Sequence, residues 1–164
     1  MMKVFLSILL LLIFTLPSNA TIIEGGVAIE QVPKNIFGSW RVNATLDRTN
    51  SPTTFKPQSI DFWNMSRFEN NLILENPMSG ANSTVSIKTV EGNLLVFSKK
   101  TPYDNNKVLT DTVTIRLNKN DFSGINDLKL ESFSLIDNHL MKTETATYLI
   151  KGEKIAGENL LIDE

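Results

Sequence analysis

The chain has 164 residues, of which 41% are hydrophobic and 21% are charged, and its formal net charge at pH 7 is −2. This length is expected to form one domain, and the charge balance excludes the basic stripe that is typical of proteins that bind nucleic acids. The sequence contains no cysteine, which excludes disulfides, thiol nucleophiles and zinc sites built on thiolates. The fold must therefore rest on its hydrophobic core.

Residues 1–20 have the pattern of a secretory signal peptide. Lys3 supplies the positive charge, Val4–Leu16 form an apolar run, and small residues lead to an expected cleavage site after Ala20. The apolar run is shorter than the roughly 20 residues that a membrane-spanning helix needs, and Pro17 interrupts a helix where an anchor would continue. We therefore expect an exported protein, periplasmic or extracellular, with no membrane span after removal of the signal.

Residues 21–37 are expected to form a loose N-terminal arm ahead of a single domain over residues 38–164. In that domain, short runs rich in Thr, Val, Ile and Phe alternate between apolar and polar residues, which is typical of strands with one solvated face. In one run, for example, Val113 and Ile115 share a face with Leu117, while the other face carries Thr and Arg. We expect eight strands, near residues 39–47, 59–69, 72–76, 83–91, 94–100, 107–117, 128–136 and 140–151.

Turn residues separate these runs, as at Asn70–Asn71, Gly92–Asn93 and Asp137–Asn138. Asn, Asp and Gly adopt the left-handed backbone of tight hairpin turns at low cost. Strands joined by short turns pair as an antiparallel meander, and eight of them can close into an all-β, up-and-down barrel without free edges. The alternative is a two-sheet β-sandwich, for which only the connections 48–58 and 77–82 are long enough.

Gly38, Ser39 and Trp40 place a Gly-x-Trp triplet at the start of the first expected strand. Together with the meander, this triplet resembles the lipocalins, a family of small exported β-barrels that carry ligands. The resemblance covers about residues 37–151. It implies that Trp40 plugs the closed base of the barrel, that Gly38 permits the tight entry, and that a ligand enters at the opposite end.

The other lipocalin motifs match in part. The family's Thr-Asp-Tyr motif is matched at two of three positions by Thr110–Thr112, inside an expected strand. Its third motif is an arginine that packs over the tryptophan; no arginine follows Arg116, so this partner is either missing or replaced by a lysine, which lacks the planar guanidinium. The helix that follows the barrel has no counterpart in the C-terminal sequence. We expect a lipocalin-like architecture, with a short turn in residues 32–37 at one barrel end.

Four residues are candidates for contact with a ligand or partner: Trp63, Arg67, Arg116 and Tyr148. Because Phe62 and Trp63 are adjacent, their side chains point to opposite faces of the strand; one lies in the core, and the other covers a loop, lines the barrel mouth or lies on a partner surface. Arg67 shares the face of Trp63. An inward-pointing arginine would anchor an anionic head group, whereas an outward-pointing one is ordinary surface.

The sequence offers few groups for catalysis. His139 is the only histidine and follows a hairpin turn, and no Gly-x-Ser-x-Gly elbow is present. We therefore predict no catalytic residue, no cofactor and no metal site. A carboxylate-based hydrolase is the remaining enzymatic alternative, although most of the strand carboxylates are expected on outer faces: Asp61, Glu69, Glu75, Asp111, Glu131 and Glu144.

Two functions fit these expectations. The first is a non-enzymatic carrier that holds a small, partly apolar or lipophilic ligand in the barrel or at its mouth. The second is a structural or protein-interaction module of the cell envelope, with a filled core, an envelope protein as partner and a binding surface near Trp63. A hollow interior opposite Trp40 would favour the first function, and an exposed aromatic patch would favour the second. A converging pair of buried carboxylates would favour the hydrolase.

Overall fold

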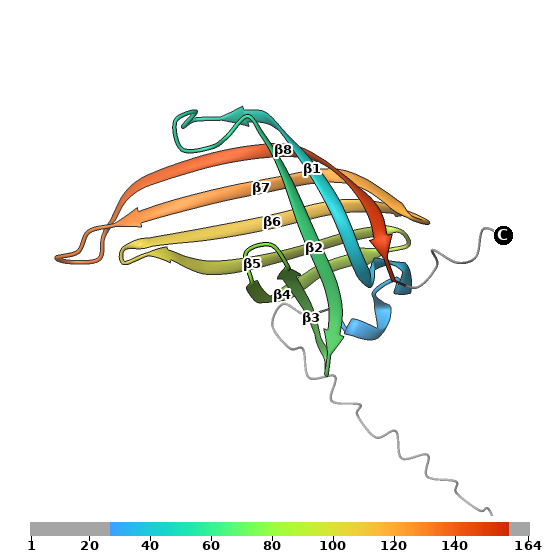
Figure 1. Ribbon diagram of the computed structural model, residues 1–164. Helices are drawn as coiled ribbons and strands as arrows, with labels where there is room; N and C mark the ends of the chain where they lie inside the picture. Colours follow the sequence, from blue (N-terminus) through green and yellow to red (C-terminus); the bar gives the residue numbers. More distant parts are fainter. Residues whose placement is uncertain (1–26, 158–164) are drawn as a thin grey trace, which may run out of the picture.

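The structure, a computed structural model, describes residues 27–157, so the expected signal peptide and the first part of the expected arm lie outside the described residues. In the described part, no helix is long and apolar enough to cross a membrane. Two short 3-10 helices, η1 (Ile29–Gln31) and η2 (Lys34–Ile36), come first. Eight strands follow (Figure 1): β1 (Gly38–Thr49), β2 (Gln58–Phe68), β3 (Asn71–Asn76), β4 (Ala81–Glu91), β5 (Leu94–Asp104), β6 (Lys107–Asn118), β7 (Asp121–Phe133) and β8 (Leu140–Ala156).

Each strand pairs antiparallel with the next one in sequence, and β8 pairs with β1 to close the barrel. The prediction of an all-β, eight-stranded up-and-down barrel is therefore confirmed. The sandwich alternative is wrong because the hydrogen-bonded contact between the first and last strands leaves no edge between two sheets.

Strand β7 begins earlier than predicted. Residues 128–136 were expected as the strand, whereas it spans Asp121–Phe133. The polar residues before position 128 suggested a long turn, but the turn consists of Lys119–Asn120 only, with Lys119 at a φ of 29°. Gly124 then lets β6 and β7 approach closely, because a Cβ at this position would lie 2.0 Å from the Thr114 carbonyl oxygen.

The strand connections define two ends of the barrel. Because the strands alternate in direction, η1 and η2, the even-to-odd hairpin turns (β2–β3, β4–β5 and β6–β7) and the end of β8 lie at one end, which we call the base (Figure 1). The β1–β2 connection, residues 50–57, lies at the other end, which we call the mouth, with the remaining odd-to-even turns. The base is where the chain enters and leaves the barrel.

Trp40 forms the centre of the base. Its side chain is 0% exposed, its Nε1 donates to the Ile36 carbonyl oxygen at 2.8 Å, and its ring centroid lies 5.1 Å from that of Phe122. Ile29 and Ile36 of the two short helices are buried in the same core. The described part of the expected loose arm, residues 27–37, is therefore packed against the barrel because its apolar side chains cover the interior at this end.

Lys154 lies over the Trp40 ring. Its side chain is 4% exposed, its Nζ lies 5.2 Å from the ring centroid, and it donates to the Asn35 carbonyl oxygen at 2.8 Å. An ammonium over an indole face is attracted by the ring quadrupole. A lysine thus lies where the lipocalin resemblance implies an arginine over the tryptophan.

Gly38 is required where the first and last strands meet. Its φ is +125°, a backbone conformation that residues with side chains rarely adopt, and a Cβ here would lie 2.3 Å from the Ala156 carbonyl oxygen. Glycine at this position therefore allows the close contact between the beginning of β1 and the end of β8.

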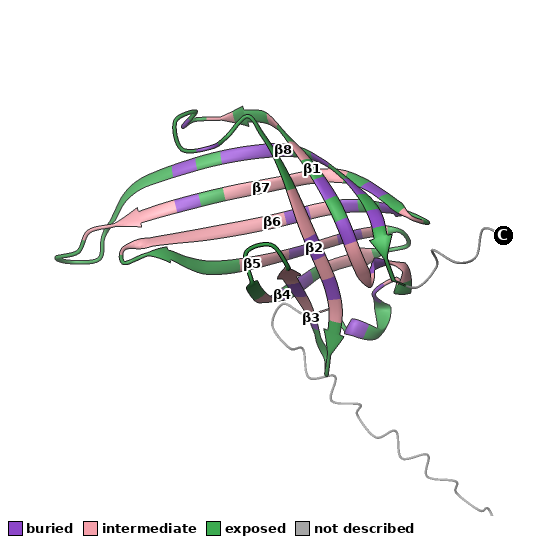
Figure 2. Cartoon of the chain, viewed as in Figure 1, coloured by how far each residue is buried: buried purple, intermediate pink, exposed green. Residues whose placement is uncertain are grey.

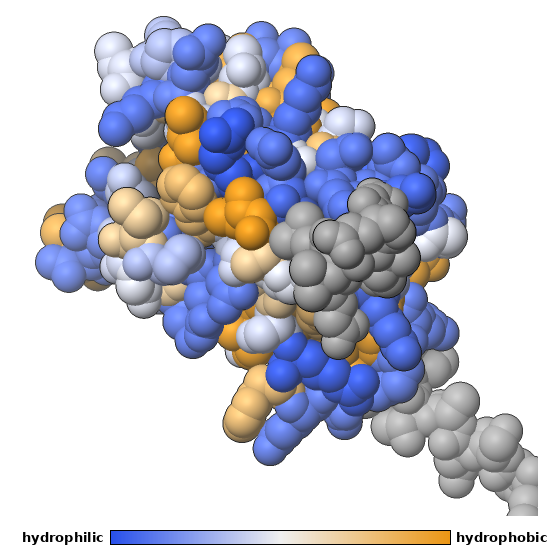
Figure 3. All heavy atoms as spheres, turned by 45° about the vertical axis from the view of Figure 1, so that its right-hand side comes forward, coloured by the Kyte–Doolittle hydropathy of each residue, from blue (hydrophilic) through white to orange (hydrophobic). Residues whose placement is uncertain are grey.

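Burial follows the alternation of the strands. Buried and exposed residues alternate along β1 and β8 (Figure 2), as expected for strands with one face toward the interior. The outer surface is mainly hydrophilic in the view of Figure 3, with smaller groups of hydrophobic residues between the polar ones. Leu135 and Ile136 in the β7–β8 connection are among the exposed large apolar residues.

Candidate ligand-binding cavity

The half of the barrel nearer the mouth contains a cavity of about 360 Å³. Its walls come from β1, β2, β6, β7 and β8, and its roof comes from the β1–β2 connection. This volume lies in the lower part of the range of roughly 300–1,000 Å³ that is usual for small-molecule sites. The apolar part of the lining is made by Val42, Ala44, Phe55, Trp63, Leu109, Leu128 and Ile150.

The hollow arises because the inward side chains change character along the strands. On β6, Ile115 and Val113 are buried nearer the base, and Asp111 follows on the same face nearer the mouth. On β1, Trp40 and Val42 are followed by Ala44. Smaller and polar side chains thus replace large apolar ones, and the space across the barrel is no longer filled.

Asp61 is one of two carboxylates in the cavity wall. Its Oδ2 accepts a hydrogen bond from Trp63 Nε1 at 3.1 Å, and its Oδ1 accepts from the Phe62 backbone N–H at 2.9 Å and from the Asn76 side-chain amide. All three donors are neutral, so they orient the carboxylate without cancelling its charge.

Asp111 is the second carboxylate. Burial raises its pKa; the Lys99 ammonium and a hydrogen bond from the Asn126 side chain oppose this effect, and the charge of the Asp61 carboxylate adds to it. The Lys99 Nζ lies 3.8 Å from Asp111 Oδ2. The Oδ1 atoms of Asp111 and Asn126 are shielded from solvent and have no hydrogen-bond partner within the part of the chain that the structure describes. The cavity wall therefore holds acceptor atoms that the protein leaves without donors.

The cavity roof carries Phe55, which is buried, and Lys56, which is exposed. The Lys56 carbonyl oxygen accepts a hydrogen bond from the Tyr148 hydroxyl at 2.9 Å. Burial raises the pKa of this hydroxyl. The contact connects the roof to β8 on the inside of the barrel.

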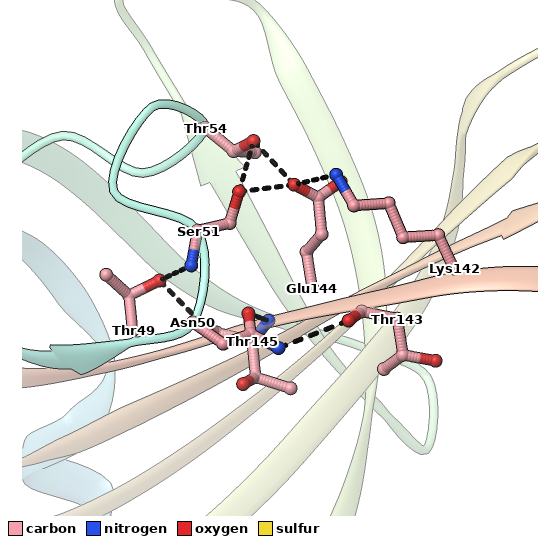
Figure 4. Close-up of polar contacts among 8 residues, drawn as sticks. All are labelled: Thr49, Asn50, Ser51, Thr54, Lys142, Thr143, Glu144 and Thr145. Carbon is pink, nitrogen blue, oxygen red and sulfur yellow. Dashed lines mark hydrogen bonds and ion pairs between the residues drawn. The ribbon is translucent and has the colours of Figure 1, made fainter.

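A second set of polar contacts ties the roof to β8 at the mouth (Figure 4). The hydroxyls of Ser51 and Thr54 both donate to Oε1 of Glu144, from Thr54 at a distance of 2.7 Å, and the Lys142 Nζ lies 2.9 Å from the same oxygen. These hydrogen bonds, first of all that from Ser51, lower the pKa of Glu144 to about 2. We call Ser51, Thr54, Lys142 and Glu144 the latch, because these residues hold the roof on the strand.

Asn50 strengthens the same connection through the backbone. Its side-chain Nδ2 donates to the Thr143 carbonyl oxygen at 3.2 Å, and its Oδ1 accepts from the Thr145 backbone N–H at 2.7 Å (Figure 4). The roof is therefore held by side-chain and backbone contacts on both sides of Glu144.

Two of the four candidate contact residues line the cavity. Trp63 is 7% exposed and stacks on Phe122 with ring centroids 5.8 Å apart, so it faces the interior and forms no exposed aromatic patch. Tyr148 lines the cavity from β8. The structure brings these two aromatic residues to the same site.

The two candidate arginines lie away from this site. Arg67 lies at the base, where its guanidinium forms an ion pair with Glu30 of η1, and its side chain is 46% exposed. Arg116 is exposed near the base, with its Nη1 donating to Asn93 Oδ1 at 3.2 Å. Neither arginine lines the cavity, so neither is placed to anchor a head group inside it.

Sequence reasoning missed the acidic lining. The strand carboxylates were expected mostly on outer faces, but Asp61 and Asp111 line the cavity and Glu144 is buried beneath the roof. The alternation of the strands indicated two of them. Asp61 lies two residues from Trp63, and Asp111 lies two residues from Val113, so each carboxylate is on the same strand face as a buried apolar residue. An acidic residue on an otherwise apolar strand face indicates a carboxylate that points into the barrel.

Other reactive groups do not gather near the cavity. His139 is exposed and its Nδ1 lies 2.6 Å from Asp137 Oδ1 in the β7–β8 connection. Among residues 27–157, no group of three or more His, Cys, Asp or Glu side chains is arranged to hold a metal ion.

No protein-family model matches the chain, and no curated protein matches it. The closed, antiparallel, up-and-down barrel of eight strands fits a lipocalin-like fold at a coarse level. The fold itself, together with the cavity, is therefore the basis for the functional proposal.

Proposed function

We propose that this protein is an exported, non-enzymatic binding protein that holds a small, partly apolar ligand inside the mouth half of its barrel. The observation that carries the proposal is the cavity of about 360 Å³, which has an apolar wall and a few convergent polar groups. Small-molecule sites have this combination, in which apolar surface supplies affinity and polar groups orient the ligand.

The packing at the base supports a ligand site at the mouth. Trp40, Phe122 and the two short helices fill the base, whereas Ala44 and the polar residues leave space nearer the mouth. The roof supplies a way in, because it is a connection between strands and its release would leave the barrel strands paired. A ligand would enter beneath the roof and lie against Trp63 and Tyr148.

We propose binding without catalysis, although two carboxylates line the cavity. Asp61 accepts hydrogen bonds from three protein donors, and Asp111 faces the Lys99 ammonium. Both carboxylates thus already have partners within the barrel wall, which suits the orientation of a ligand better than general acid and base catalysis on opposite sides of a bond.

The proposal is tested by filling the cavity. We expect at least one of three small probes, 2-phenylethylamine, 2-phenylethanol or phenylacetate, to bind the mature protein in calorimetric titrations and to change the fluorescence of Trp63. The substitution Ala44→Leu should weaken this binding by about tenfold or more, because the added side chain takes ligand space; this factor corresponds to about 1.4 kcal/mol.

The matched control is Ala156→Leu, which adds the same side chain at an exposed position at the base. It should leave the affinity of the probe unchanged. Failure of all three probes to bind, or equal weakening by both substitutions, would argue against a ligand site in the cavity.

A further inference from the structure

We propose that the ligand carries a protonated amine on an apolar, preferably aromatic body, and that the Asp61 carboxylate binds the amine. This inference rests on the proposed function, because it names the chemical class of the ligand for the same cavity. From the sequence alone, an inward-pointing arginine would bind a ligand with an anionic head group; a ligand with a cationic group takes its place in this proposal.

The first argument is the balance of hydrogen-bond donors and acceptors in the wall. Two donors of the wall are already used: Trp63 Nε1 donates to Asp61, and the Tyr148 hydroxyl donates to the Lys56 carbonyl oxygen. The Ser59 hydroxyl also borders the cavity and can either donate or accept. Acceptors remain, namely the Oδ1 atoms of Asp111 and Asn126, which have no partner among the described residues. A carboxylate has about four acceptor positions, so Asp61 also keeps capacity beyond its three donors. The cavity therefore suits a ligand that donates hydrogen bonds.

The second argument is charge. Asp111 faces the ammonium of Lys99 at 3.8 Å, whereas the hydrogen-bond partners of Asp61 are all neutral, and no ion pair involves Asp61 in the described part of the chain. Of the other cations nearer the mouth, Lys142 is bound to Glu144 at 2.9 Å, and Lys56 is an exposed residue of the roof. Inside the wall, Asp61 is thus the charge that a cationic ligand would neutralise.

The third argument is the aromatic lining. Trp63, Tyr148 and Phe55 all border the cavity. Aromatic faces attract cations through the ring quadrupole, and they also pack well against an aromatic or aliphatic body. A carboxylate beside an aromatic wall thus matches an ammonium group joined to an apolar body by a short chain.

The experiment compares three probes of similar size that differ in charge: 2-phenylethylamine, 2-phenylethanol and phenylacetate. Calorimetric titration of the mature wild-type protein at pH 7 should show that the amine binds at least about tenfold more tightly than the alcohol, as expected for a hydrogen bond to a charged group. Phenylacetate should bind most weakly of the three because its charge is repelled by Asp61.

Substitution then tests the residue. Asp61→Asn keeps the size of the side chain and removes its charge; it should weaken binding of the amine by about 10- to 100-fold and change binding of the alcohol by less than about threefold. Asp47→Asn removes the same charge from an exposed position on β1 and should leave the affinity for the amine unchanged.

The outcomes separate this inference from the proposed function. If the alcohol or phenylacetate binds as tightly as the amine, the amine assignment is wrong and the cavity still binds ligands. An Asp61→Asn protein that is folded and keeps full affinity for the amine would also overturn the assignment. If the substitution prevents folding, the ranking of the three probes on the wild-type protein decides. If none of the probes binds, the proposed function itself fails.

Discussion

The base and the mouth half of the barrel are built from the same eight strands, yet their interiors are filled in opposite ways. At the base, the large side chains of Trp40, Phe97 and Phe122 are at most 2% exposed and belong to one buried core, in which Trp40 packs against Phe122. Nearer the mouth, Ala44 and Asp111 occupy equivalent inward positions. Because a closed ring of strands fixes the interior width, the size of the inward side chains decides whether that space is core or cavity.

The largest expected effect is at the base. Trp40→Ala should lower the free energy of unfolding by about 3–5 kcal/mol, because it removes a fully buried indole together with its hydrogen bond and its contact with Phe122. Urea denaturation of the purified protein would measure this loss. Phe68→Ala, which truncates an exposed aromatic residue on β2, should cost less than about 0.5 kcal/mol. If the two substitutions lowered the free energy of unfolding equally, Trp40 would not be the centre of the base packing.

A matched pair of leucines compares the two regions directly. Leu95 is fully buried toward the base, whereas Leu109 borders the cavity. Leu95→Ala should cost about 2–5 kcal/mol, and Leu109→Ala should cost less than Leu95→Ala, since its side chain already faces empty space on one side. The measurement is the difference between their urea midpoints. A larger cost at Leu109 would mean that the mouth half is packed as tightly as the base.

The latch should show the smallest effect and a distinctive pH dependence. The pKa of Glu144 in the folded protein is about 2, below its ordinary value of 4.5. The carboxylate therefore contributes stability above pH 4.5, and this contribution is lost as the pH falls from 4.5 towards 2. Glu144→Gln should lower the urea midpoint at pH 7, and the difference from the wild-type protein should shrink between pH 4.5 and pH 2.

Glu153→Gln is the control for the latch. Glu153 forms an ion pair with Arg41 on the outer surface, with side chains 65% and 50% exposed. Such surface pairs contribute little to stability, so this substitution should change the midpoint little at any pH. A Glu144→Gln difference that stays constant from pH 7 to pH 2.5 would contradict the role of the carboxylate in holding the roof.

The barrel could be predicted from the sequence because its signals are local. Alternating residues and short turns indicate strands and their order, and Gly92–Asn93 forms the turn at the predicted place. Polar residues concealed the start of β7, since a strand with a solvated outer face can resemble a turn. The prediction failed where the local composition was ambiguous.

The site was less predictable because it depends on distant contacts. Which face of β2 carries Trp63 into the interior is decided only when the barrel closes. Lys154 reaches Trp40 only because β8 pairs with β1. The pairing of β1 with β8 also contains a shift of register between Leu46 and Arg48. Such an irregularity interrupts the alternation of inward and outward side chains, so the side of the sheet on which a residue lies can no longer be predicted by counting along the strand. The fold of the roof over the mouth has no periodic signal at all.

The pairing of β1 with β8 also has a consequence for the order of assembly. Seven of the eight strand pairings join neighbours in sequence, whereas this one brings Ser39 beside Ala156. Contacts between distant residues form at a greater cost in chain entropy, so we expect the hairpins to form first and the ring to close last. Because Gly38 and Gly157 are adjacent at the base, a linker that keeps η1 and η2 in place could join the end of β8 to the segment that precedes β1. In a circular permutant opened in the β7–β8 connection, β8 and β1 would be neighbours in sequence. Their pairing would then be a local contact and should form faster.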